Sequence, residues 1–110
     1  MTIIRQNGSE LLQYQATAVS NGAFGKCYGP SQAYQAVATA SSGAYTATIV
    51  IEGSNDGATG ITLGTISLSS TAPTVATDGF VTGQAPWAYV RARVTAITGV
   101  GTSVSTWMAC

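Results

Sequence analysis

The segment Trp87-Ala88-Tyr89-Val90-Arg91-Ala92-Arg93-Val94-Thr95-Ala96 decides the fold of this chain, because its even-numbered positions are all Ala or Val. The odd-numbered positions hold aromatic, basic and polar residues. Alternation with a period of two is expected of a β-strand that buries one face and exposes the other. The segment therefore predicts a half-buried strand.

The same period recurs along the rest of the chain, where no helical period of 3.6 is found. Further strands are expected at 12–18, 34–40, 45–52, 61–68, 78–81 and 101–108. The run Gly53 to Gly57 has the composition of a hairpin turn. The apolar phase changes between Leu63 and Ile66, which predicts a β-bulge near Gly64.

About eight short antiparallel strands are therefore expected within one domain over residues 1–110. Strands at this turn-punctuated spacing are typical of an all-β, two-sheet sandwich of jelly-roll or Greek-key type. Residues 1–8 are a candidate N-terminal arm. Residues 20–32 form the longest stretch expected to be irregular, and long loops in compact domains are commonly functional.

The composition is unusual in its charge, since only 7% of the 110 residues are charged, against about 25% in typical soluble domains. Four acidic and four basic residues cancel, which favours a protein that sits among neighbours. So few cations argue against a nucleic-acid partner. No apolar run is long enough for a membrane span or a signal-peptide core, so synthesis in the cytoplasm and retention there until assembly or cell lysis are expected.

The chain has no histidine, which removes the commonest general base and the usual partner of a nucleophilic Ser or Cys. Its four carboxylates are isolated in sequence, and Asp56 has a simpler role as a turn residue. We therefore expect no catalytic residues, no cofactor and no metal site. Cys27 and Cys110 could form one disulfide, but a reducing compartment and the absence of CxxC spacing favour two free thiols.

Aromatic and arginine side chains are enriched in interface hot spots, and the strand quoted above carries four of them on one side. An equally weighted reading places the two rings in the core and the arginines on a solvated face. Trp107 and Met108 are interpreted as packing residues. The candidate interface residues are Trp87, Tyr89, Arg91, Arg93, Phe24, Tyr28, Ile3, Ile4 and Arg5.

Three segments together carry a resemblance to a known class of protein: 49–57, 78–80 and 86–94. Read in order, they resemble small all-β virion proteins of tailed bacteriophages, in particular capsid decoration (cement) proteins. The turn at 53–57 also looks like the hairpin of discoidin-like and carbohydrate-binding jelly rolls. Those jelly rolls commonly have an aromatic residue after the turn, where this chain has Ala58, Thr59 and Gly60.

The resemblance implies a non-enzymatic structural protein that binds the outer surface of a phage shell and stabilises it. Its partners would be the major capsid protein or another virion protein, and copies of itself in a dimer or trimer. It would be assembled in the host cytoplasm and located in the virion. The alternative is a jelly-roll module for carbohydrate or a host surface, as part of a tail, with Trp87 and Tyr89 as a stacking platform.

Overall fold

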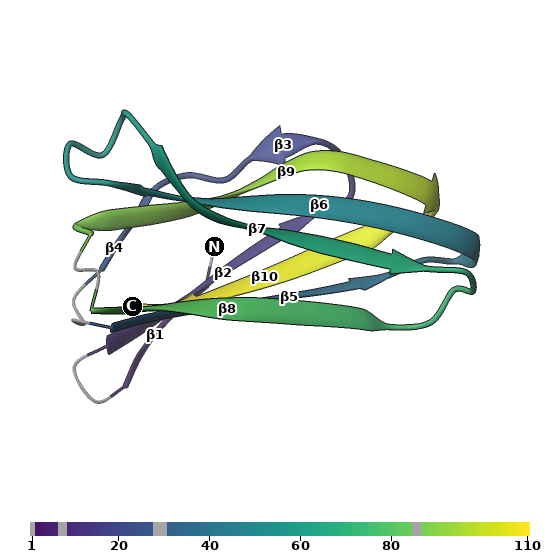
Figure 1. Cartoon of the computed structure of the whole chain (residues 1–110), viewed down its shortest axis with the longest axis horizontal. Helices are drawn as coiled ribbons and strands as arrows, with labels where there is room; N and C mark the ends of the chain where they lie inside the picture. Colours follow the sequence, from purple (N-terminus) through teal and green to yellow (C-terminus); the bar gives the residue numbers. More distant parts are fainter. Residues whose placement is uncertain (1, 7–8, 28–30, 85–86) are drawn as a thin grey trace.

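The computed structural model describes residues 2–6, 9–27, 31–84 and 87–110, which form two antiparallel β-sheets packed face to face (Figure 1). Sheet A contains, in spatial order, β1 (Thr2–Gln6), β2 (Ser9–Ala16), β10 (Ser103–Ala109), β5 (Ser31–Thr39) and β8 (Ala76–Gln84). Sheet B contains β3 (Ser20–Asn21) and β4 (Gly25–Lys26), both paired with β9 (Tyr89–Val100), and then β6 (Ser42–Ser54) and β7 (Ile61–Ser70). The predicted two-sheet sandwich is confirmed.

The path of the chain identifies which kind of sandwich this is. After the β1–β2 hairpin it alternates between the sheets, staying in sheet B for β3 and β4 and again for β6 and β7. The resulting order, β2-β10-β5-β8 facing β3/β4-β9-β6-β7, is that of a jelly roll. Within the described ranges, eight strands have five residues or more, in agreement with the number predicted.

The core lies between the inner faces of the two sheets and follows the predicted alternation as far as Val94. Ala96, which was predicted in the same apolar row, is exposed because the pairing of β9 with β6 shifts register after Val94. In β9, Val90, Ala92 and Val94 are at most 1% exposed, and Ile49 and Ile51 lie beside them on β6. Burial of each isoleucine side chain stabilises the fold by about 1.5–3 kcal/mol. Other buried apolar residues are Leu12, Tyr34, Ala36, Ala38, Tyr45, Ala47, Ile66, Leu68, Val104 and Met108.

A β-bulge in β7 explains the change of apolar phase. Ile51 pairs with Gly64 and the next residue of β6 pairs with Thr62, so Leu63 is the extra residue. Ile61 before the bulge is 55% exposed, whereas Ile66 after it is 1% exposed. The bulge predicted near Gly64 is therefore confirmed.

Cys27 and Cys110 form a disulfide, so the prediction of two free thiols is wrong. Cys27 follows β4 of sheet B and Cys110 follows β10 of sheet A, and their Cα atoms lie 5.0 Å apart. The bond thus joins the two sheets at one end of the sandwich. The two positions are 83 residues apart in sequence, so only the folded path of the chain brings them together.

The N-terminal segment, expected as an arm, contributes an edge strand to sheet A in this structure. Its residues from Thr2 to Gln6 pair with β2 in a register that runs from Gln13 to Ser9. The side chains of Ile3, Ile4 and Arg5 lie outside the described part of the structure, as does the whole of Tyr28. The described residues contain no helix long and apolar enough to cross a membrane.

Candidate functional site on sheet B

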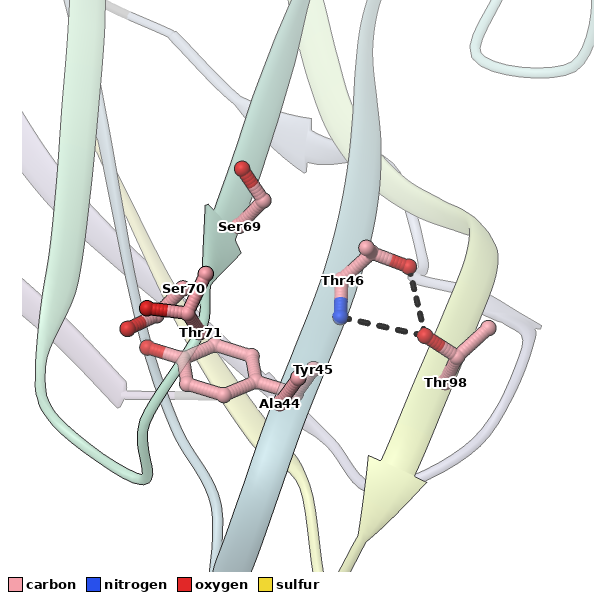
Figure 2. A pocket seen from close by; sticks show the side chains of 7 residues that line it. All are labelled: Ala44, Tyr45, Thr46, Ser69, Ser70, Thr71 and Thr98. Atoms are coloured by element: carbon pink, nitrogen blue, oxygen red, sulfur yellow. Dashed lines mark hydrogen bonds between the residues drawn. The ribbon is translucent and has the colours of Figure 1, made fainter.

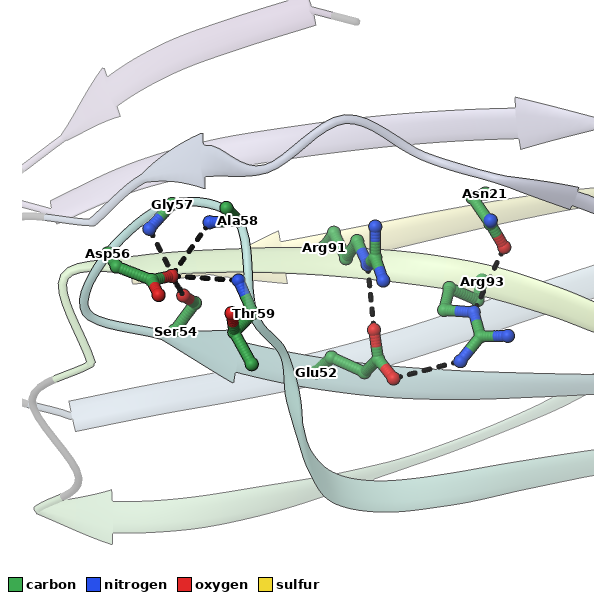
Figure 3. Close-up of polar contacts among 9 residues, drawn as sticks. All are labelled: Asn21, Glu52, Ser54, Asp56, Gly57, Ala58, Thr59, Arg91 and Arg93. Carbon is green, nitrogen blue, oxygen red and sulfur yellow. Dashed lines mark hydrogen bonds and ion pairs between the residues drawn. The ribbon is translucent and has the colours of Figure 1, made fainter.

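A cluster of hydrogen-bonded charged and polar side chains lies on the outer face of sheet B (Figure 3). Glu52 of β6 stands opposite Arg91 of β9 in the strand register. Arg91 Nε donates to Glu52 Oε1 at 2.7 Å, and Arg93 Nη1 donates to Oε2 at 2.9 Å. One carboxylate is therefore shared by two guanidinium groups.

Burial and charge act in opposite directions on the carboxyl group of Glu52. Only 6% of this residue is exposed, and burial disfavours its ionised form. The hydrogen bonds and positive charges of Arg91 and Arg93 outweigh burial and hold the pKa of Glu52 below its usual range. The carboxylate therefore stays charged and keeps both arginines in position.

Both arginines have a second partner in the segment that precedes β5. The Arg91 guanidinium lies over the Phe24 ring, 4.5 Å from its centroid, and Arg93 Nε donates to Asn21 Oδ1 at 2.9 Å. A cation held over an aromatic face in this way gains about 0.5–2 kcal/mol. We call Phe24, Tyr89, Arg91 and Arg93, held by Asn21 and Glu52, the arginine surface.

The segment that carries Phe24 was expected to be irregular over 20–32, and this expectation needs correction for its described residues. Two short strands, β3 and β4, pair with β9. Between and after them, Gly22 N donates to Ala92 O at 2.8 Å and Cys27 N donates to Ala88 O at 2.9 Å. Edge pairing with β9 therefore orders the segment beside the arginines.

The turn between β6 and β7 borders the arginine surface. Asp56 Oδ1 accepts hydrogen bonds from the backbone N–H groups of Thr59 at 2.7 Å and Ala58 at 2.8 Å, and from the Ser54 hydroxyl at 2.7 Å. These bonds hold the pKa of the Asp56 carboxyl well below its usual range. The prediction that Asp56 is a turn residue is confirmed, because its carboxylate organises the loop.

The turn also supports the ring of Tyr89 in the arginine surface. Gly57 has a φ of 75°, a left-handed conformation that glycine adopts readily. A Cβ atom at Gly57 would lie 3.6 Å from the Tyr89 ring, so the ring rests against the turn backbone. Tyr89 belongs to β9, and the β6–β7 turn holds its ring in place.

The structure separates Trp87 from the other predicted interface residues. Trp87 precedes β9, and its ring packs on Gly53, where an added Cβ would come within 2.7 Å of the indole. The ring also packs against the hydrophobic core. The Trp87 ring is therefore not on the side of Tyr89, Arg91 and Arg93, and it packs against the core as the alternative reading has it.

Sequence reasoning missed Glu52 and Asn21 as parts of the site. Glu52 was treated as an isolated carboxylate, although its outward phase on β6 was visible in the alternation. Its role depends on the pairing of β6 with β9, two strands that are not consecutive in sequence. No local signal pointed to Asn21.

A second feature of sheet B is an open pocket of about 590 Å³ near the other end of the same sheet (Figure 2). Thr46 on β6 and Thr98 on β9 stand opposite each other, with their Oγ1 atoms 2.6 Å apart. The lining consists of Ala44, Tyr45, Thr46, Ser69, Ser70, Thr71 and Thr98. Most of these side chains carry a hydroxyl group, which both donates and accepts hydrogen bonds, and the lining contains no charged side chain.

Comparison with known proteins gives the chain no relative. It matches no protein-family model, no curated protein and no solved structure. A jelly roll hosts many unrelated functions, so the fold alone does not assign one. The arginine surface is therefore the feature that bears most directly on function.

Proposed function

We propose that this protein is a non-enzymatic structural protein of a virion, of the capsid decoration type, and that it docks on the shell through the arginine surface. The observation that carries this proposal is the fixed arrangement of Arg91 and Arg93 around one buried carboxylate. The resemblance of its sequence segments to phage decoration proteins supports the same function. The partner would be the major capsid protein or another virion protein.

Preorganisation is what makes these arginines suited to docking. Binding normally costs about 0.5–1.5 kcal/mol for each long side chain that becomes ordered. Here Glu52, Asn21 and Phe24 already hold both guanidinium groups, while the side chains of Arg91 and Arg93 remain 22% and 34% exposed. A guanidinium has five N–H donors, so each arginine keeps donors for carbonyl or carboxylate oxygens of a partner.

The composition and the disulfide are consistent with a protein displayed on a particle. A chain with 7% charged residues and no net charge is poorly protected against association, which suits a subunit surrounded by neighbours. Disulfides persist on virion surfaces and other oxidising locations, and are rare in the cytoplasm. Weak contacts repeated around a symmetric shell would add up through multivalency, especially for a dimer or trimer.

The first experiment counts copies of the chain in purified phage particles by quantitative mass spectrometry. Capsid decoration predicts on the order of hundreds of copies per particle, as repetition over a symmetric shell requires. A small multiple of three or six would instead indicate a tail component. Either that result or absence from the particles would overturn the proposal.

The second experiment tests the docking surface with purified shells. Arg93→Gln leaves the Arg91–Glu52 pair in place, and Tyr89→Ala leaves the whole ion cluster in place. Each variant should weaken shell binding about ten-fold or more if these side chains are interface hot spots. Thr98→Ala, on the same sheet face but away from the arginines, is the matched control and should bind as the wild type does. If Arg93→Gln and Tyr89→Ala bind shells as tightly as the wild type and the control do, docking through this surface is contradicted.

A further inference from the structure

The outer face of sheet A, on the opposite side of the sandwich, carries a half-buried tryptophan, Trp107. In β10, Val104, Thr106 and Met108 are buried, so the alternating residues Ser105 and Trp107 face outward. The interpretation of Met108 as a packing residue is confirmed. Trp107 was interpreted in the same way, but its half-buried ring lies on the outer face of the sheet and outside the core.

Amide side chains stand on both sides of this ring. The strand register places Trp107 opposite Gln13 of β2 and opposite Gln35 of β5. Side chains in such cross-strand positions have Cβ atoms about 4.5–5.5 Å apart, so both amide side chains are close enough to contact the indole. The neighbouring residue Ser105 stands opposite Gln15, which adds a hydroxyl and a third amide to the same face.

One of these amides is held in place by the sheet itself. Gln35 Nε2 donates to Thr77 Oγ1 at 3.2 Å, and the Thr77 hydroxyl donates to the carbonyl of Ala36 at 3.0 Å. The Gln35 carbonyl oxygen is left to accept a hydrogen bond from a ligand. This part of the outer face is thus ordered before a ligand binds.

A shallow depression beside the indole gives this face a place for a ring-sized group. Its volume is about 170 Å³, and it is lined by Ala33, Tyr34, Gln35, Trp107 and Ala109. Pockets for whole drug-sized ligands are larger, at about 300–1,000 Å³. The depression therefore fits one ring of a longer ligand that continues along the surface.

We propose that this face of sheet A is a binding site for a neutral saccharide. The indole of Trp107 would stack on the C–H face of one sugar ring, because the negative face of an aromatic ring attracts the weakly positive C–H groups. Gln13, Gln35 and Ser105 would bond the sugar hydroxyls, since an amide both donates and accepts. The proposal goes beyond capsid decoration and does not depend on it.

Charge selects a neutral ligand for this site. The described outward side chains of β2, β10, β5 and β8 carry no charge, so an acidic saccharide or a phosphate would find no cation here. These residues are Gln13, Gln15, Ala33, Gln35, Val37, Thr39, Thr77, Val81, Ser103, Ser105, Trp107 and Ala109. A protein partner is a poorer fit, because protein interfaces are enriched in several aromatic and arginine anchors and this face has one tryptophan among amides.

Affinity electrophoresis of the full-length protein through gels that contain a polysaccharide tests the proposal. The neutral probes are dextran, laminarin and galactomannan, and alginate is the acidic comparison. The wild type should be retarded by at least one neutral probe and not by alginate. Trp107→Ala should lower the affinity about ten-fold or more, as loss of a central aromatic anchor does. Gln13→Ala and Gln35→Ala should each lower it by a smaller factor.

Thr48→Ala on sheet B is the matched control and should be retarded as the wild type is. Thermal unfolding of each variant verifies that the fold is intact, and Trp107→Tyr, which keeps an aromatic ring, should recover part of the binding. Three results would overturn the proposal: no retardation by any neutral probe, equal retardation of Trp107→Ala and the wild type, or stronger retardation by alginate. Loss of shell binding or of self-association in Trp107→Ala, with retardation unchanged, would identify the face as a protein interface instead.

Discussion

The Cys27–Cys110 disulfide should be a major source of stability, because it closes a loop across most of the chain. Replacing both cysteines by alanine removes a cross-link between positions 83 residues apart. In the chain-entropy description, a loop of that length restricts the unfolded state enough to stabilise the fold by about 4.5 kcal/mol. Domains of this size have total stabilities of about 5–15 kcal/mol, so the loss is a large fraction of the whole.

Equilibrium unfolding in urea, followed by tryptophan fluorescence, measures this loss. With an m-value of about 1.5 kcal/mol per molar urea, the midpoint should fall by about 3 M. Chemically reduced wild-type protein should unfold close to the midpoint of the double alanine variant, which separates loss of the cross-link from loss of the buried sulfur atoms. If oxidised and reduced protein unfold at the same urea concentration, with the oxidation state verified by mass spectrometry, the loop-closure reasoning is refuted.

Three further predictions concern single side chains. Because the pKa of Glu52 in the fold lies below its ordinary value of 4.5, its contribution to stability is complete above that pH and is lost as the pH falls through the lowered value. Glu52→Gln should therefore flatten the acid side of the curve of unfolding free energy against pH, and an unchanged curve would contradict the ion cluster. Gly64→Ala would place a Cβ 2.5 Å from the Phe80 ring and should cost about 1–3 kcal/mol in thermal unfolding, whereas Thr65→Ala on the same strand should cost little. Burial raises the pKa of the Tyr34 hydroxyl from 10.0 to about 12, so the stability contributed by its neutral form is complete below pH 10 and is lost as the pH rises toward 12. Tyr34→Phe should remove that alkaline loss in urea unfolding, and persistence of the loss would assign it to another group.

Alternation predicted the layers of the fold well because it is a local property of each strand. The inner faces of β6 and β9 and the bulge beside Gly64 follow from the spacing of apolar residues alone. The same reasoning failed for Trp87 because β9 begins only at Tyr89, so the period of two does not extend back to the tryptophan. For Trp107 the expectation followed residue type and not alternation, whereas β10 buries the polar Thr106 and turns the large aromatic ring outward.

The parts that could not be predicted are the ones that depend on distant segments. The ion cluster requires β6 and β9 to lie side by side, and Asn21 joins it only because β3 pairs with β9 as well. The disulfide likewise requires the end of β10 to lie beside the residue that follows β4. Period and composition contain no information about which strands become neighbours when they are not joined by a hairpin turn, so these contacts become visible only in the folded chain.

The jelly roll keeps the two proposed binding surfaces on opposite outer faces, and their chemistry gives them different responses to salt. Docking through Arg91 and Arg93 involves charges that are partly exposed, and raising the ionic strength shortens the Debye length from about 10 Å at 0.1 M to about 3 Å at 1 M. Binding of a neutral sugar on Trp107 involves no such charge and should keep its strength. A salt series on the wild-type protein should therefore weaken shell binding while polysaccharide retardation stays constant. If shell binding and polysaccharide retardation weaken together as salt is raised, one charged surface serves both activities. The assignment of sugar binding to sheet A and shell binding to sheet B would then be wrong.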